Sequence, residues 1–158
     1  MIRIAQRSML RQKGAALVEM VLVTPILLIL LLATGDLTRA FIEHNTLTKA
    51  VRSGARYVAA NALEGTLGVV NIDATLRTEA KNLVVYGYTT PAAGTLPVLP
   101  GLTLANVTVA QIAGTDEIEV SVTYSISGII GPVLPVFYGG PGISTTRDLR
   151  AAVTMRAL

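Results

Sequence analysis

The sequence predicts an α+β fold, in which one long N-terminal helix packs on a small antiparallel β-sheet together with a second, shorter helix. Three observations predict it. An apolar run covers residues 15–33. Apolar residues at helical spacing continue to Ala62, and no proline occurs between residues 36 and 62. Three later segments have the composition or the alternation of β-strands, with turn residues between them.

The apolar run is long enough to cross a lipid bilayer. Residues 15–33 are interrupted only by Glu19, Thr24 and Pro25. About 20 helical residues cross the roughly 30 Å of hydrocarbon, where a single segment satisfies its backbone only as a helix. Residues 1–14 hold four basic residues and no acidic ones, so the N-terminus is expected to be cytoplasmic. The sequence thus divides into a basic leader (1–14), a transmembrane segment (15–35) and an extracytoplasmic domain (36–158).

Two residues of the run need an explanation. A carboxylate such as Glu19 costs about 2.5 to 3.5 kcal/mol at the centre of a membrane helix and less near its end. It therefore requires either a partner or a side chain that reaches back to the headgroups. Pro25 removes one backbone donor, so a helix kink is expected there.

The helix is expected to run from about Ala15 to Ala62, with its second half (36–62) amphipathic. Gly54 costs about 1 kcal/mol relative to alanine inside a helix, which indicates close approach of another element. The predicted apolar stripe consists of Leu37, Phe41, Leu47, Val51, Ala55, Val58 and Ala62. The predicted polar face carries Arg39, Glu43, Lys49, Arg52 and Arg56, with Arg39 and Glu43 paired across one exposed turn.

A second helix and three strands follow. Residues 72–86 are expected to form a helix capped by Asp73 and ended by Gly87. Its predicted apolar stripe is Leu76, Ala80, Leu83 and Val84. Strands are expected over residues 102–112, 116–127 and 146–157, the first with a bulge between Leu104 and Val107. The apolar stretch 133–138 either folds over the sheet end as core or forms an exposed contact for a partner.

Composition argues against an enzyme and against a nucleic-acid-binding protein. The net charge of +3 comes from the leader, because the chain after residue 14 carries nine basic and ten acidic side chains. The sequence has no cysteine, no tryptophan and one histidine, His44, with no acid and nucleophile set beside it. We therefore expect no catalytic residue, metal, cofactor or small-molecule substrate.

The N-terminal segment resembles a known family. A basic leader, Gly14, and Glu19 five residues later at the head of an apolar helix are similar to the cleavage motif of type IV prepilins. The sequence around this motif resembles the TadE-like family of the tight-adherence (Tad/Flp) pilus system, specifically over residues 13–62 and weakly over residues 149–156. The residues that carry the resemblance are Gly14 to Met20, Pro25, Arg39-Ala40-Phe41 and Ala50 to Tyr57. Met20 departs mildly from the family, which often has an aromatic residue there.

The resemblance implies a function. A prepilin peptidase in the bacterial inner membrane would cut between Gly14 and Ala15. Glu19 would become the fifth residue of the mature chain and pair with the N-terminal ammonium of a neighbouring subunit. The protein would be a pilin-like minor pilin or pseudopilin that helps assemble an adhesive Flp-type pilus. Its partners would be the peptidase, other pilins or pseudopilins, the inner-membrane assembly platform and membrane lipid. It would stay in the membrane or enter the cell-surface pilus.

Two alternatives remain open at this point. The chain could be an uncleaved single-pass anchor whose exported domain binds a periplasmic partner. Residues 32–35 could also be read as a signal-peptidase site, although the run is longer than a usual signal h-region and has Glu19 at its head.

Overall fold

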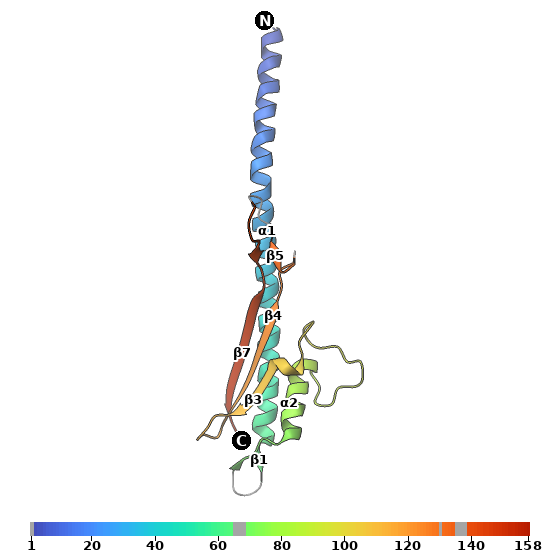
Figure 1. The fold of residues 1–158 in the computed structure, drawn as a ribbon, viewed down its shortest axis with the longest axis vertical. Coiled ribbons are helices and arrows are strands. Elements are labelled where there is room, and N and C mark those ends of the chain that lie inside the picture. Colours follow the sequence, from blue (N-terminus) through green and yellow to red (C-terminus); the bar gives the residue numbers. More distant parts are fainter. Residues whose placement is uncertain (1, 65–68, 130, 135–138) are drawn as a thin grey trace. The chain divides into compact units, whose positions relative to one another are not determined.

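The computed structural model describes the backbone of residues 2–64, 69–129, 131–134 and 139–158. Side chains are described from residue 16 onward in these ranges, except for Glu64, Val69 and Leu134. Contacts divide the chain into two compact units, Met1–Thr38 and Arg39–Leu158. Helices, strands and their labels are shown in Figure 1. The α+β prediction is confirmed: a long N-terminal helix, a second short helix and a three-stranded antiparallel sheet are present.

Helix α1 covers Ile2–Asn61, so it begins within the leader instead of at Ala15. In the second unit its buried side is an unbroken series at spacings of three and four residues. Ala40, Glu43, Leu47, Val51, Gly54, Ala55, Val58 and Ala59 form this buried side, and Ala62 follows the helix end.

The predicted stripe was wrong in its first two members. Leu37 and Phe41 are 63% and 68% exposed. Phe41 and Leu47 are six residues apart, which places them about 120° apart around a helix of 3.6 residues per turn. The prediction also assigned Glu43 to the polar face, whereas it is only 7% exposed. Its spacing from Leu47 places it on the buried side.

Gly54 is where α1 and α2 come closest. A Cβ atom at this position would lie 2.5 Å from Cγ2 of Val84 and 3.5 Å from the carbonyl oxygen of Ala80. Both of these residues belong to α2, and both are fully buried. The predicted close approach is therefore confirmed, because only a residue without a side chain leaves room for α2 here.

Helix α2 spans Ala74–Tyr86 and has the expected caps. The carboxylate of Asp73 accepts a hydrogen bond from the Leu76 amide at 2.6 Å. Gly87 has a φ of 78° and donates its amide to the Leu83 carbonyl at 3.0 Å, a left-handed ending that favours glycine. The buried stripe of α2 differs from the predicted one at a single member: it includes Val85 and not Leu83, which is half-buried.

The sheet consists of β3 (Val107–Gln111), β4 (Glu117–Ile126) and β7 (Arg147–Arg156), in the order β3-β4-β7 and antiparallel throughout. Along β4 the burial alternates without a break, and the buried residues face the helices. The expected bulge before β3 is instead a 3₁₀ turn, η1 (Leu104–Asn106), in which the amide and the hydroxyl of Thr103 both donate to Oδ1 of Asn106. The β-branched run misled because Asn106 closes a local turn with its side chain.

Two short hairpins complete the described chain. Strands β1 (Leu63–Glu64) and β2 (Val69–Val70) pair after α1, and β5 (Val133–Leu134) pairs with β6 (Ile143–Ser144) between β4 and β7. Val133 is 52% exposed, which goes against a core role for that residue, while residues 135–138 lie outside the described part.

Candidate processing and assembly segment

The four predicted site residues all lie on α1. Gly14 and Ala15 have helical backbone, and the side chain of Ala15 lies outside the described part. Glu19 is exposed one turn further on, and Pro25 lies inside the helix, which continues on both sides of it. The structure brings no other described charged side chain within bonding distance of Glu19. Since this part of α1 is helical, the five-residue spacing of Gly14 and Glu19 corresponds to slightly more than one helical turn.

Residues 16–31 present apolar side chains on every side of the helix. Twelve large aliphatic or methionine side chains here are at least 40% exposed: Leu17, Val18, Met20, Val21, Leu22, Val23, Ile26, Leu27, Leu28, Ile29, Leu30 and Leu31. The helix is long and apolar enough to cross a membrane, and none of its most apolar window is buried within the chain. Lipid or other subunits must therefore cover it.

Hydroxyl groups at the end of the apolar run are satisfied within the helix. Thr34 donates to the carbonyls of Leu30 and Leu31 at 3.1 and 2.7 Å, and Thr38 donates to Thr34 at 2.9 Å. These bonds remove the cost of placing threonine at the edge of an apolar phase.

Sequence reasoning missed the burial of Glu43. Its Oε1 accepts from Nε of Arg39 at 2.7 Å, and the Arg39 side chain is 46% exposed. Its Oε2 is buried and has no hydrogen-bond partner in the described structure. The sequence does contain a signal for this burial: Glu43 lies four residues before Leu47, so both residues lie on the same face of the helix. His44, the neighbouring residue, is exposed.

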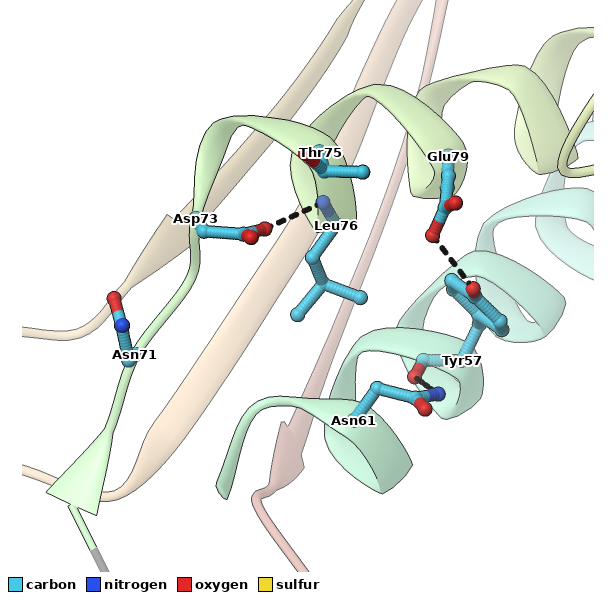
Figure 2. A pocket seen from close by; sticks show the side chains of 7 residues that line it. All are labelled: Tyr57, Asn61, Asn71, Asp73, Thr75, Leu76 and Glu79. Carbon is cyan, nitrogen blue, oxygen red and sulfur yellow. Dashed lines mark hydrogen bonds between the residues drawn. The ribbon is translucent and has the colours of Figure 1, made fainter. Parts of the chain in front are cut away.

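A hollow of about 210 Å³ lies between the end of α1 and the start of α2 (Figure 2). It is lined by Tyr57, Asn61, Asn71, Asp73, Thr75, Leu76 and Glu79. The Tyr57 hydroxyl donates to Oε2 of Glu79 at 2.7 Å, which ties the two helices together. Asp73 is engaged as the α2 cap, so both carboxylates of the hollow already serve the fold. Among the described residues, no group of three His, Cys, Asp or Glu could hold a metal ion.

This link predicts a loss of stability in strong alkali. The bond to Glu79 raises the pKa of Tyr57, and burial and the charge of Glu79 act in the same direction. Burial likewise raises the pKa of Tyr124, with Glu43 adding to the shift and Arg39 opposing it. A phenol whose folded pKa is raised contributes stability that is complete below pH about 10 and is lost as the pH rises through the folded value.

We therefore expect Tyr57→Phe to lower the unfolding free energy at about pH 8 and to weaken the alkaline decline. Urea unfolding of the full chain in detergent micelles at several pH values measures both effects. Tyr88→Phe, at a tyrosine that is 64% exposed, is the control. An unchanged alkaline decline in Tyr57→Phe would contradict the assignment.

Taken together, the exposed apolar helix and the small α+β unit fit a membrane protein with a single candidate span among its described residues. The family model described as TadE-like protein matches residues 14–56. Over these residues the chain is similar to the TadE-like family of the tight-adherence pilus system, in agreement with the resemblance seen in the sequence. No curated protein and no solved structure matches the chain.

This similarity suggests involvement in assembly of the Tad/Flp pilus, with other pilus components as partners. The matched range contains Gly14, Ala15, Glu19 and Pro25, and it also reaches into the second unit as far as Arg56. It stops before α2 and the sheet, so the family match covers the long helix and not the rest of the domain.

Proposed function

We propose that the chain is a minor pilin or pseudopilin of the Flp-type pilus, made as an inner-membrane precursor and cut by a prepilin peptidase between Gly14 and Ala15. One observation carries the proposal: Gly14 and Glu19 lie five residues apart at the head of an exposed apolar helix, inside the segment that matches the TadE-like family. The basic leader keeps the N-terminus in the cytoplasm, and the second unit is exported. The chain acts as a subunit and not as an enzyme.

The role of Glu19 follows from the low dielectric of the membrane. Cleavage would create an ammonium at Ala15, four residues before the carboxylate. In hydrocarbon each unpaired charge is costly, so each favours an arrangement in which another subunit supplies the opposite charge. Exposure of Glu19 on the isolated helix is consistent with a partner outside this chain. The carboxylate would thereby make assembly of subunits preferable to the dispersed state.

The first test is the N-terminal residue of the protein recovered from cells that carry the pilus machinery. We expect mass spectrometry to find Ala15 as the N-terminus, and Gly14→Val to leave the full precursor because a branched side chain replaces a hydrogen at the scissile bond. Thr24→Leu, a change deeper in the same segment, is the control and should be cut normally. An intact Met1 in the unaltered protein would contradict the proposal and leave an uncleaved anchor that binds a periplasmic partner. An N-terminus near Gly35 would indicate signal-peptidase cleavage.

The second test separates processing from assembly. We expect Glu19→Leu to be cut after Gly14 like the unaltered chain, yet to be lost from complexes with other pilus subunits. Removing the carboxylate makes the segment more apolar, so membrane insertion should not suffer. Crosslinking followed by affinity purification measures the association, again with Thr24→Leu as the control. Equal recovery of the Glu19→Leu and Thr24→Leu proteins in these complexes would refute the assembly role.

A further inference from the structure

Strand β7 forms an open edge of the three-stranded sheet. It pairs with β4 along its whole length, from Arg147 to Arg156, and this pairing occupies one of its two sides. Among the described residues, no backbone group outside β4 bonds to β7. Figure 1 shows β7 at the side of the sheet away from α2. Because the amide and the carbonyl of every second residue point to the free side, the edge presents a row of unpaired donors and acceptors.

The inward side chains of β7 are covered from one flank only. Val120 of β4 and its direct partner Val153 of β7 show the difference, since Val120 is fully buried and Val153 is half-buried. Leu149 and Met155, on the same face of β7, pack against the core and are likewise half-buried. A further strand beside β7 would cover these three side chains as β7 covers those of β4.

The open edge is long and regular. Strand β7 contains no proline and no glycine, and its register with β4 runs over all ten residues without a bulge. Prolines, bulges and short length are devices by which sheet edges usually prevent the addition of a strand. The opposite edge, β3, is half as long, and α2 lies against it. Of the two edges, β7 is therefore the one suited to accept another strand.

The charges of β7 define the kind of strand that fits. Three arginines and one aspartate give it a net charge of +2: Arg147, Asp148, Arg150 and Arg156. Asp148 accepts from the Ser125 hydroxyl at 2.6 Å, and Arg156 lies 3.6 Å from Asp116. Arg150 forms no ion pair with any described residue. A carboxylate directly opposite Arg150 would complement its charge, whereas a second copy of β7 would bring the same net positive charge.

We propose that the free edge of β7 is a docking site for an extended, acidic segment of another protein, which adds to the sheet as a fourth strand antiparallel to β7. This orientation continues the antiparallel order of the sheet. Main-chain hydrogen bonds would supply the affinity, and alternate side chains would supply the specificity. Apolar side chains of the added strand would cover Leu149, Val153 and Met155, and its carboxylates would lie opposite Arg150 and Arg156. The proposal goes beyond membership of a pilus and does not depend on proteolytic processing of the leader.

The probe is a short synthetic peptide with a fluorescent label, added to the full chain in detergent micelles. It has nine residues, with valine at every second position, glutamate at the first and seventh positions, and threonine at the others. In the antiparallel register its two glutamates lie opposite Arg156 and Arg150. A second peptide has lysine in place of glutamate. Two further forms of the glutamate peptide carry N-methyl groups, one on the valines and the other on the remaining residues, because only one of these sets of amides can face β7.

We expect fluorescence anisotropy to show that the glutamate peptide binds about tenfold more tightly than the lysine peptide. One of the two N-methylated peptides should lose binding, and the other should keep it. Arg150→Glu should weaken binding of the glutamate peptide about tenfold, because an attraction becomes a repulsion. Arg52→Glu, at an exposed arginine of α1, is the matched control and should leave binding unchanged. Unchanged circular dichroism verifies that both variants fold.

Four results would overturn the proposal. They are an absence of peptide binding, equal binding of the two N-methylated peptides, equal effects of Arg150→Glu and Arg52→Glu, and protection of β7 by a second copy. Equal binding of the methylated peptides would indicate charge attraction without strand pairing. Protection of β7 amides from hydrogen exchange that grows with protein concentration, without any peptide, would assign the edge to a second copy. The N-terminal residue of the processed chain affects none of these results, so this proposal and the proposed function can fail separately.

Discussion

Gly54→Val is expected to destabilise the second unit by about 3 kcal/mol, near the top of the usual range for overpacking a core. The first added carbon would already lie 2.5 Å from Cγ2 of Val84. Val84 is fully buried and has a short, stiff side chain, so it cannot move aside without shifting α2. The higher helix propensity of valine relative to glycine offsets only a few tenths of a kcal/mol of this loss. A unit of this size has roughly 5 to 15 kcal/mol of total stability, so the loss is a large part of it.

Urea unfolding of the full chain in detergent micelles, followed by circular dichroism, measures this loss. Ser53→Val makes a β-branched residue at the adjacent, exposed position and should change the unfolding free energy by about 0.5 kcal/mol or less. The contact itself is tested by adding Val84→Ala, which should restore stability in Gly54→Val although it costs stability on its own. Equal effects of Gly54→Val and Ser53→Val would show that α2 does not pack where the structure places it.

Gly54 also shows what the sequence could reveal about packing. A glycine inside a helix has a local cost that no local feature offsets, so it predicts a tertiary contact, and the structure supplies one. The caps of α2 at Asp73 and Gly87 were predictable for the same reason, because their chemistry acts within one turn. The alternation along Ile118, Val120 and Val122 was equally readable, since the period of a strand is two.

The errors arose where a local pattern had two structural solutions. Phe41 was assigned to the core because it is large and apolar, although its phase relative to Leu47 places it on another face. Glu43 was assigned to the surface because it is charged, although its phase places it inside. Between Leu104 and Val107 the composition suited a bulge and a tight turn equally, and the side chain of Asn106 decided for the turn. In the candidate segment, motif spacing alone points to Gly14 and Glu19, and their roles stay predictions, whereas the burial of Glu43 depends on tertiary packing.

Arg39→Met and Glu43→Met are expected to have effects of opposite character, although they remove the two halves of one ion pair. Glu43 is 7% exposed and its Oε2 has no hydrogen-bond partner in the described structure, so Arg39 provides its neutralising charge at 2.7 Å. Removing that guanidinium leaves a buried carboxylate without its counter-charge, which typically costs 3 to 5 kcal/mol. Because Arg39 is half exposed and water screens the pair, we expect about 2 kcal/mol.

Glu43→Met instead removes the buried charge and puts an apolar side chain between Ala40 and Leu47, which lie three residues before and four residues after it on the same helix face and belong to the core. Arg39 can then turn to solvent, so the unfolding free energy should be unchanged or should rise by about 1 kcal/mol. The same urea unfolding experiment measures both variants, and Arg52→Met, at an exposed arginine of the same helix, is the control and should have almost no effect. A greater loss in Glu43→Met than in Arg39→Met would mean that the carboxylate is stabilised by more than the Arg39 charge. In that case the unsatisfied Oε2 would not be a cost to the fold, and the burial of Glu43 would require a different physical reason.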